Sequence, residues 1–304
     1  MIRRSSNRLR RCCRLSADFA SVPREPIGAP CADFHLLSRK VRIAVGVAYR
    51  GTELEGWQSQ PSGNTVQDRL EHAFSEIASE RIRVIGAGRT DSGVHASAQV
   101  AHFDTSADRS GSAWIRGANS LLPDTIAIQW AATVAGDFHA RYSALARSYR
   151  YVLYNDPVRP AVLAGLTGWF HLPLDLDRMR QAAKHLLGEH DFSSFRSAEC
   201  QAKSPVRVIE RAEIRTNGPY FLFDFTANAF LHHMIRNIVG CLVYVGKGKH
   251  MPEWLAELIA ARDRRLAPPT FAASGLYLSD VRYEARWGLP EFSRMMPFEM
   301  GAAR

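Results

Sequence analysis

Gly86-Ala-Gly-Arg-Thr-Asp-Ser-Gly-Val-His95 is the stretch around which the rest of the sequence can be arranged. Polar and apolar residues alternate in residues 81–85 before it and, more loosely, in residues 94–105, which predicts a strand on each side. Its three glycines permit positive φ and close backbone approach, so we expect a tight connection that presents polar side chains. Arg89 and Asp91 would point to the same side of an extended backbone, where a guanidinium and a carboxylate can pair.

The simplest interpretation of this stretch is a structural turn with an Arg–Asp pair, as for most short Gly-rich segments. A dinucleotide-binding fingerprint is excluded, because Asp91 stands where a third small residue is needed and its carboxylate would repel a pyrophosphate. A nucleophile elbow is excluded as well, because Ser92 lacks the G-x-S-x-G pattern. What remains is a carboxylate on a stiff loop, oriented by a neighbouring Arg, which suits an Asp that acts as nucleophile or base.

Length and composition restrict the class of protein. The 304 residues leave room for one large or two ordinary domains, and 46% hydrophobic content with six Trp favours a packed core over disorder. No apolar run reaches the length of a membrane span, so we expect no membrane association. The net charge of +9 is uneven: residues 1–40 hold nine Arg or Lys against three Asp or Glu, and the rest of the chain holds 30 against 27. The high isoelectric point is therefore a weak sign of nucleic-acid binding by the folded part.

The Arg-rich residues 1–40 also contain Ser, Pro and Gly but no apolar signal-peptide core. We expect a disordered basic extension without a catalytic role. An organelle transit peptide, an arm that touches RNA phosphates and a translation start further along the chain are the alternatives.

Cysteine usage indicates the compartment. The odd count, the adjacent pair and the lack of a C-x-x-C motif argue against a disulfide framework and a zinc site. We expect free thiols in a reducing compartment and hence a cytoplasmic protein. The cysteines are Cys12, Cys13, Cys31, Cys200 and Cys241.

Periodicity predicts an α+β order for the first half of the chain. Residues 41–49 read as a strand, and Asn64-Thr65 followed by Gln67-Asp68 resembles a helix start. The two strands flanking the Gly-rich stretch come next, then a short helix at 114–122 and a strand at 125–134. The order strand–helix–strand–strand–helix–strand predicts a largely antiparallel sheet.

The second half repeats this order. The pattern predicts a strand at 147–154, an amphipathic helix at 175–187 and a hairpin of 206–216 with 220–229 around Asn217-Gly218. Helices at 231–245 and 252–264 and a closing strand at 276–283 follow. We therefore predict an α+β fold of two similar halves with mainly antiparallel sheets flanked by helices, joined around a central cleft. The predicted domains are residues 41–140 and 141–285, followed by a tail at 286–304.

Several separated motifs carry a family resemblance. In the same order as in that family, they resemble the tRNA pseudouridine synthase A family from about residue 41 to about residue 283. The resemblance implies two sheets that meet in one extended sheet, and it implies that the central cleft between the halves is an RNA-binding cleft. The motifs are Gly88-Arg-Thr-Asp-Ser-Gly-Val-His-Ala96, Phe138-His-Ala-Arg-Tyr-Ser143, Arg147-Ser-Tyr-Arg-Tyr151, Asp191-Phe-Ser-Ser-Phe-Arg196, Asn228-Ala-Phe-Leu-His-His-Met-Ile-Arg-Asn237 and Gly275-Leu-Tyr-Leu278.

The resemblance implies an isomerase that converts uridine to pseudouridine at positions 38–40 of the tRNA anticodon stem-loop, through an Asp nucleophile acting on a flipped-out uridine. It also implies a homodimer in which one tRNA spans both subunits. No cofactor is expected, since the reaction has no redox step and the chain has no phosphate-binding loop. Ser92 departs from the Ala that is usual in the family. A non-catalytic RNA-binding module and a uridine isomerase acting on another RNA are the alternative functions.

Asp91 is the catalytic nucleophile that the family motif implies; an Asx-turn residue is its structural alternative. Arg89 is expected to orient Asp91, or to contact the phosphate beside the target nucleotide. Tyr149 matches the Tyr that stacks on the flipped-out base, with a core aromatic as the alternative. Leu276 resembles the apolar residue that packs over the target base, and a core leucine is equally compatible.

Arg236 matches the family's Arg and is expected to pair with Asp91 or bind a phosphate. On a helix through residues 231–245, His232 and His233 would share one polar face with Arg236. Adjacent histidines on a helix diverge, and no third ligand follows at metal spacing, so we expect no metal site there. We predict instead that the two histidines bind RNA or form hydrogen bonds in the active site.

Overall fold

The computed structural model describes residues 40–290. The predicted basic extension, apart from Lys40, and the predicted tail from residue 291 onward lie outside the described residues. Within residues 40–290, no helix is both long and apolar enough to cross a membrane.

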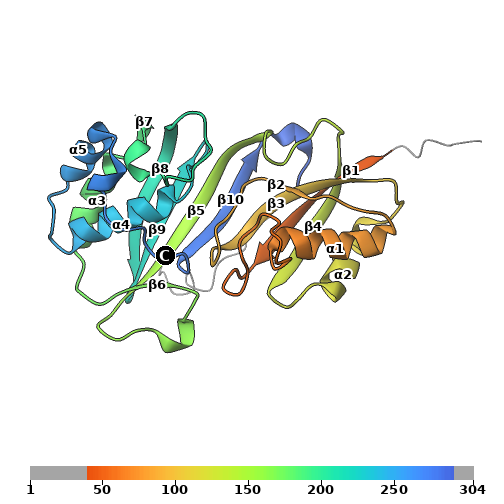
Figure 1. The fold of residues 1–304 in the computed structure, drawn as a ribbon, viewed down its shortest axis with the longest axis horizontal. Coiled ribbons are helices and arrows are strands. Elements are labelled where there is room, and N and C mark those ends of the chain that lie inside the picture. Colours follow the sequence, from red (N-terminus) through yellow and green to blue (C-terminus); the bar gives the residue numbers. More distant parts are fainter. Residues whose placement is uncertain (1–39, 291–304) are drawn as a thin grey trace, which may run out of the picture. The chain divides into compact units, whose positions relative to one another are not determined.

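One mixed, mainly antiparallel sheet of ten strands organises this part of the chain, in the order β4-β1-β3-β10-β5-β9-β8-β7 (Figure 1). β2 pairs with β3, and β6 pairs with β5. The pairings of β10 with β3 and of β5 with β6 are parallel. The strands are β1 Val41–Tyr49, β2 Ile85–Gly86, β3 His95–Thr105, β4 Ile126–Val134, β5 Ala144–Asn155, β6 Gly168–Phe170, β7 Gly188–Asp191, β8 Val206–Asn217, β9 Tyr220–Ala227 and β10 Leu276–Tyr283.

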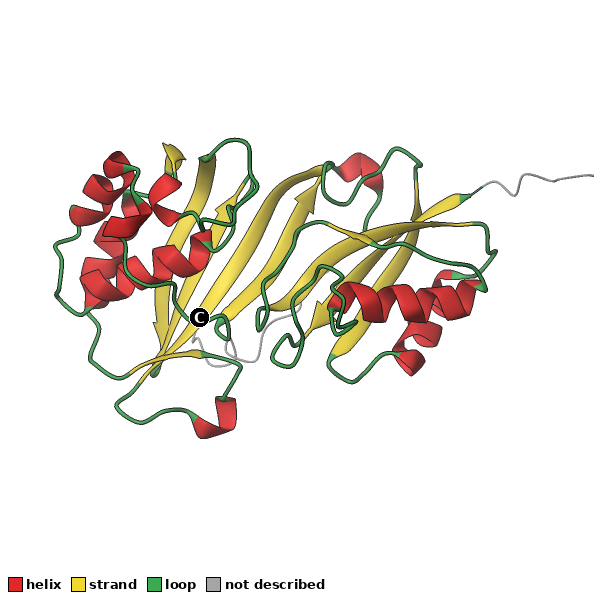
Figure 2. Cartoon of the chain, viewed as in Figure 1, coloured by secondary structure: helices red, strands yellow, loops and turns green. Residues whose placement is uncertain are grey.

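Helices cover the two ends of the sheet and leave its centre open. α1 and α2 lie over the end that contains β1 and β4, and α3, α4 and α5 lie over the end that contains β7, β8 and β9 (Figures 1 and 2). Between the two groups, β5 and β10 carry no helix in this view (Figure 2). The predicted α+β class is confirmed, and both halves contribute to one continuous sheet. The helices are α1 Val66–Ala78, α2 Gly111–Leu121, α3 Leu176–Lys184, α4 Met234–Gly246 and α5 Trp254–Ala261.

Local sequence signals account for several element ends. The Thr65 side chain accepts the backbone N–H of Asp68 and caps α1, as the sequence predicts. α2 begins at Gly111, three residues before the predicted start, because the Ser110 side chain accepts the N–H of Ala113 and supplies the cap. β8 and β9 form the predicted hairpin, in which Gly218 has a φ of 56°.

The predicted strand at residues 81–85 is wrong. Only Ile85 and Gly86 pair with β3, although Ile82 and Val84 are buried as an alternating pattern requires. The N–H groups of Ile82 and Val84 donate to the side chains of Ser75 and Glu71 on α1 (2.9 and 3.0 Å). Side-chain acceptors on α1 thus take the place of the backbone hydrogen bonds to a neighbouring strand that would have made this segment a strand.

The start of the predicted helix at 231–245 also needs correction. α4 begins at Met234, and His233 has a left-handed backbone with a φ of 62°. Such a backbone is rare outside glycine and is enriched where a site imposes it. Leu231, His232 and His233 therefore form a turn that leads into the helix, which changes where the two histidines point.

β10 joins the two predicted halves. It comes from the C-terminal half, yet it pairs parallel to β3 through Tyr277 and Leu278 and antiparallel to β5. On β5 and β10, Tyr149 lies opposite Leu278 and Tyr151 lies opposite Leu276, so the expected base-binding residues Tyr149 and Leu276 stand on neighbouring strands. Cys200 and Cys241 are free thiols, as predicted.

Candidate active site

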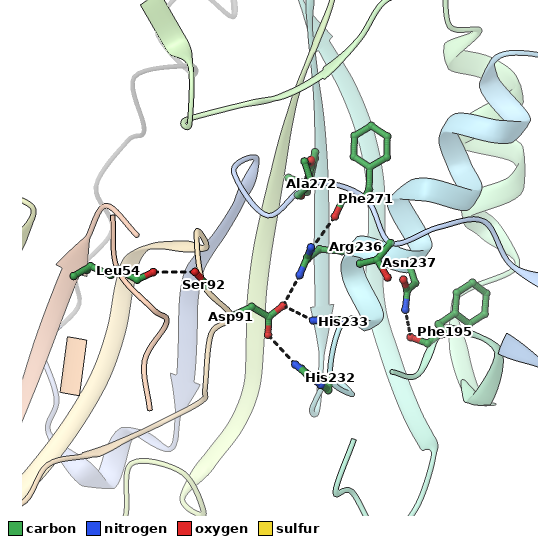
Figure 3. A network of polar contacts seen from close by, with 12 residues as sticks. Leu54, Asp91, Ser92, Phe195, His232, His233, Arg236, Asn237, Phe271 and Ala272 are labelled. Atoms are coloured by element: carbon green, nitrogen blue, oxygen red, sulfur yellow. Dashed lines mark hydrogen bonds and ion pairs between the residues drawn. The ribbon is translucent and has the colours of Figure 1, made fainter. Parts of the chain in front are cut away.

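A groove of about 1540 Å³ is lined by residues from both halves of the chain. The loop between β2 and β3 contributes Asp91, and the turn before α4 and the first turn of α4 contribute His232, His233 and Arg236 (Figure 3). The lining that the structure describes contains six arginines and three carboxylates: Arg83, Arg89, Arg141, Arg147, Arg207, Arg236, Glu55, Asp91 and Glu199. This excess of positive charge suits a polyanionic ligand.

Arg236 holds the Asp91 carboxylate. Its Nη1 donates to Oδ2 of Asp91 at 2.8 Å, while its Nε donates to the backbone carbonyl of Phe271 at 2.8 Å (Figure 3). The second bond fixes the guanidinium plane, so the first has a defined direction. Both side chains are mostly buried, with exposures of 15% for Arg236 and 22% for Asp91. The sequence prediction that Arg236 pairs with Asp91 or binds a phosphate thus takes the first form in this structure.

The two histidines contact the same carboxylate as Arg236 (Figure 3). Nε2 of His232 is 3.2 Å from Oδ1 of Asp91, and Nε2 of His233 is 3.3 Å from Oδ2. Their ring centroids are 4.0 Å apart. The expectation that these rings diverge is wrong, because it assumed a helix where the left-handed His233 forms a turn. Burial lowers the pKa of His233 and the charges of His232 and Arg236 add to this, while Asp91 opposes it.

The donor atoms of Asp91, His232 and His233 lie within 4.8 Å of one another, so their spacing could hold a metal ion. The positive guanidinium of Arg236 already lies 2.8 Å from Oδ2 of Asp91, and a second cation at that oxygen would be repelled. The chemistry of the neighbours therefore fits a held carboxylate better than a metal ligand. The expected lack of a metal stays a prediction.

Arg89 does not pair with Asp91 in the structure. It is exposed and lines the groove, and among residues 40–290 no ion pair joins it to a carboxylate. The expectation of a same-side pair assumed an extended backbone. In the structure Arg236 pairs with the Asp91 carboxylate instead, and the chain turns after Asp91, where the N–H of Val94 donates to the Asp91 carbonyl and Gly93 has a φ of 77°. Arg89 is left free to meet a ligand.

Backbone contacts fix the loop that carries Asp91. The N–H of Trp57 donates to the Thr90 carbonyl at 3.0 Å, and the Gln99 side chain donates to the Gly88 carbonyl at 2.9 Å. The Thr90 hydroxyl lies 2.8 Å from the hydroxyl of the buried Tyr49. Neighbours thus hold the peptide before Arg89 and the peptide before Asp91, which limits how far Asp91 can move.

His95 pins the far end of the same loop. Its Nδ1 accepts the N–H of Gly51 at 3.0 Å, so its Nε2 carries the proton and donates to the Ser274 carbonyl at 3.0 Å. The ring stacks on Tyr277 with centroids 4.5 Å apart. Burial lowers the pKa of His95, which favours the neutral form that these contacts require. This anchoring role was missed in the sequence, since none of its partners lies near His95 along the chain.

Tyr149 and Leu276 both line the groove, as expected for residues that contact a base. The Tyr149 ring packs edge-on against Phe230 with centroids 5.2 Å apart. Burial raises the pKa of Tyr149, and Tyr49 and Asp91 add to this, so the hydroxyl is protonated at neutral pH. Tyr151 lies in the core and donates to the Ala272 carbonyl, so it is a structural aromatic.

Arg147 is a groove residue whose role was missed in the sequence. Its guanidinium donates to the carbonyls of Ala87 (3.1 Å), Asn228 (3.0 Å) and Arg141. It therefore ties the Asp91 loop to the connection before β5 and to the end of β9. The one signal in the sequence that could have identified Arg147 is its position two residues before Tyr149.

The family model that matches this chain and two proteins of similar sequence are all named tRNA pseudouridine synthases. A model of the tRNA pseudouridine synthase family matches residues 45–143 and 182–284, which include Asp91, Arg236 and Leu276 but not Tyr149. The chain is 59% identical over 254 residues to tRNA pseudouridine synthase A of Polaromonas naphthalenivorans (strain CJ2), a match that covers 82% of this chain and 96% of the relative. It is 57% identical over 258 residues to the protein of the same name from Thiobacillus denitrificans, covering 85% and 99%. A solved Cbf5-Nop10-Gar1 complex matches 66% of this chain at 15% identity, with a TM-score of 0.30 and 45% of that chain covered, which is too remote to carry an argument.

Proposed function

The chain belongs to the tRNA pseudouridine synthase family, and we propose that it isomerises uridine to pseudouridine at positions 38–40 of the tRNA anticodon stem-loop. The observation that carries this proposal is the Asp91 carboxylate, which a stiff loop presents in an arginine-rich groove and Arg236 holds at 2.8 Å. A nucleophile must be placed within reach of one atom of its substrate, and this anchoring provides that placement.

The reaction exchanges one bond for another within the nucleotide. The C1′–N1 bond of uridine breaks, the base rotates and C1′ joins C5, while C5 loses its proton and N1 gains one. Asp91 attacks either C1′ of the ribose or C6 of the uracil, and the covalent bond it forms is broken again before product leaves. The net change therefore needs no redox partner or energy carrier.

The target base must leave its stack before Asp91 can reach it. Unstacking and unpairing a base costs a few kcal/mol, and contact with the Tyr149 ring and Leu276 offsets this cost. The neutral Tyr149 hydroxyl, beside the Asp91 loop, can pass a proton as the base rotates. The charge of Arg89, free of any carboxylate among the described residues, suits the phosphate next to the extruded nucleotide.

The remaining assignments follow the family resemblance. We propose a homodimer that works in the cytoplasm without a metal or cofactor, and a boundary near residue 140 between its two halves. His232 and His233 contact the carboxylate in the free protein, and we assign them to positioning Asp91 and the RNA beside it.

The test uses tRNA transcripts labelled with tritium at uridine C5, since isomerisation releases this label to water. We expect release by the wild-type chain and a loss of more than roughly 10⁴-fold in the rate for Asp91→Asn, with tRNA binding retained. Asp177→Asn makes the same chemical change at an exposed residue on α3 and should keep the wild-type rate. Turnover by purified Asp91→Asn would remove Asp91 from the nucleophile role.

The alternative functions give different outcomes in the same assay. A non-catalytic RNA-binding module would bind tRNA but release no tritium with any variant. A uridine isomerase specific for another RNA would fail on tRNA and succeed on ribosomal or small nuclear RNA transcripts with the same label.

A further inference from the structure

The connection between β4 and β5 brings an exposed aromatic residue to the rim of the groove. Arg141 and Tyr142 lie in this connection and line the same groove as Asp91. Tyr142 is 76% exposed, which is the largest exposure of any aromatic side chain among residues 40–290. A single exposed ring is common on protein surfaces, so what points to a ligand is the position of Tyr142 on the lining of an arginine-rich groove.

The Tyr142 ring is backed by a second ring and still leaves 76% of its residue surface exposed. The His139 ring stacks behind it, with centroids 4.3 Å apart and planes tilted by 29°. The Arg141 guanidinium carbon lies 5.7 Å from the centre of the ring. This is within the range of a cation–π contact, so a base that stacks on the exposed ring would also meet the guanidinium charge.

The segment that carries this ring is rigid and tied to the catalytic loop. The N–H groups of Arg141 and Tyr142 both donate to Nδ1 of His139 at 3.2 Å. The Arg141 carbonyl accepts a bond from Arg147, whose guanidinium also donates to the Ala87 carbonyl in the Asp91 loop. The ring thus keeps a set position relative to the loop, which lowers the entropy lost when a ligand stacks on it.

We propose that Tyr142 is a stacking platform for a second RNA base, distinct from the uridine that enters beside Tyr149. Extruding one nucleotide leaves its neighbours without a stacking partner. A fixed aromatic ring at the rim replaces that partner, and it accepts any base because every base has a flat π face. This inference rests on the proposed function and extends it to the recognition of several adjacent uridines with different neighbours.

The test measures binding and turnover of full-length tRNA by Tyr142→Ala, Tyr142→Leu and Tyr142→Phe in the full chain. Stacking on an aromatic ring predicts that the Ala and Leu variants bind about 5-fold to 100-fold more weakly, while Phe binds like the wild type. The rate at saturating tRNA should stay within about twofold for all three, since Tyr142 does not touch the reacting atoms. Val162→Ala, which changes a 94% exposed side chain outside the groove, is the matched control and should bind normally.

A second measurement identifies the base. Single abasic nucleotides are placed along the anticodon arm, and binding is compared between the wild type and Tyr142→Ala. At the stacked position the abasic change weakens wild-type binding, but it adds nothing to the loss already present in Tyr142→Ala.

Two results overturn the proposal. The first is that Tyr142→Ala binds tRNA as tightly as the wild type. The second is that, at every abasic position, the loss of binding from the missing base adds in full to the loss from Tyr142→Ala. Binding by Tyr142→Leu equal to that of Tyr142→Phe would also overturn it, because the contact would then be apolar without stacking. Tritium release by the wild type is measured alongside. Its failure refutes the proposed function, whereas normal release together with normal Tyr142→Ala binding refutes the platform alone.

Discussion

The Gly-rich loop of residues 86–95 and the turn of residues 231–236 meet at Asp91, but they hold it in different ways. The loop is fixed mainly through backbone groups that contact Trp57, Gln99 and, by way of His95, Gly51 and Ser274. The turn contributes side chains alone, with Arg236 placed 145 residues from Asp91 along the chain. The loop thus sets where the Asp91 carboxylate stands, and the turn sets its orientation and charge environment. Changes in the turn should therefore affect kcat, whereas changes in the loop at residues other than Asp91 should affect folding stability or substrate affinity.

Among changes that leave Asp91 itself in place, the largest effect is expected for Arg236→Gln. Removing the guanidinium leaves Oδ2 of Asp91 without its 2.8 Å partner and lets the carboxylate rotate. We expect kcat for tritium release to fall roughly 100-fold with little change in KM, because misplacing a reacting group costs about this much. Arg236→Lys restores the charge without the second bond to Phe271, so it should recover part of the rate. A change in KM alone would show that Arg236 binds substrate and does not orient Asp91.

A smaller effect, on stability, is expected for His95→Phe. The Phe ring can still stack on Tyr277, but the Gly51 N–H and the Ser274 carbonyl lose their partners, at a cost of about 2 kcal/mol in the free energy of unfolding. Urea unfolding at pH 7.5 measures this cost, and His72→Phe on the exposed face of α1 is the control.

The same variant gives a pH test with a defined sign. The pKa of His95 is lower in the folded than in the unfolded chain, so the unfolded chain binds the proton first as the pH falls. The stabilisation that the neutral His95 ring gives to the folded chain is complete above pH 6.5. It is lost as the pH falls through the pKa that His95 has in the folded chain. The stability gap between wild type and His95→Phe should therefore narrow from pH 7.5 to pH 5. A constant gap would mean that His95 acts by packing alone.

The smallest effect is expected for Arg89→Gln, which changes the loop without touching the held carboxylate. Since Arg89 is exposed and has no carboxylate partner among residues 40–290, we expect KM to rise a few-fold and kcat to stay within about twofold. Loss of one phosphate contact should also reduce the slope of log binding constant against log salt by about 1. If kcat of Arg89→Gln fell as far as the kcat expected for Arg236→Gln, the result would show that Arg89 does orient Asp91.

Much of the fold was readable from the sequence because the signals are local. Alternating apolar residues placed β1 and β10, Thr65 marked the start of α1, and Asn217-Gly218 marked the β8–β9 turn. Each depends on the geometry of a few consecutive residues, which the chain encodes directly. The motif around Asp91 likewise identified the candidate nucleophile, since the residue types needed there lie within ten positions of one another.

The partners of that nucleophile were decided by the tertiary structure. Spacing predicted an Arg89–Asp91 pair, yet Arg236, which lies 145 residues from Asp91 along the chain, pairs with the carboxylate. The left-handed His233 brings two histidines together where helix spacing predicts that they diverge. The insertion of β10 between β3 and β5 brings the two halves together in one sheet. Contacts of this kind depend on the order of strands in the sheet and on the backbone angle of a single residue. The short-range pattern of apolar and polar residues predicts neither of these.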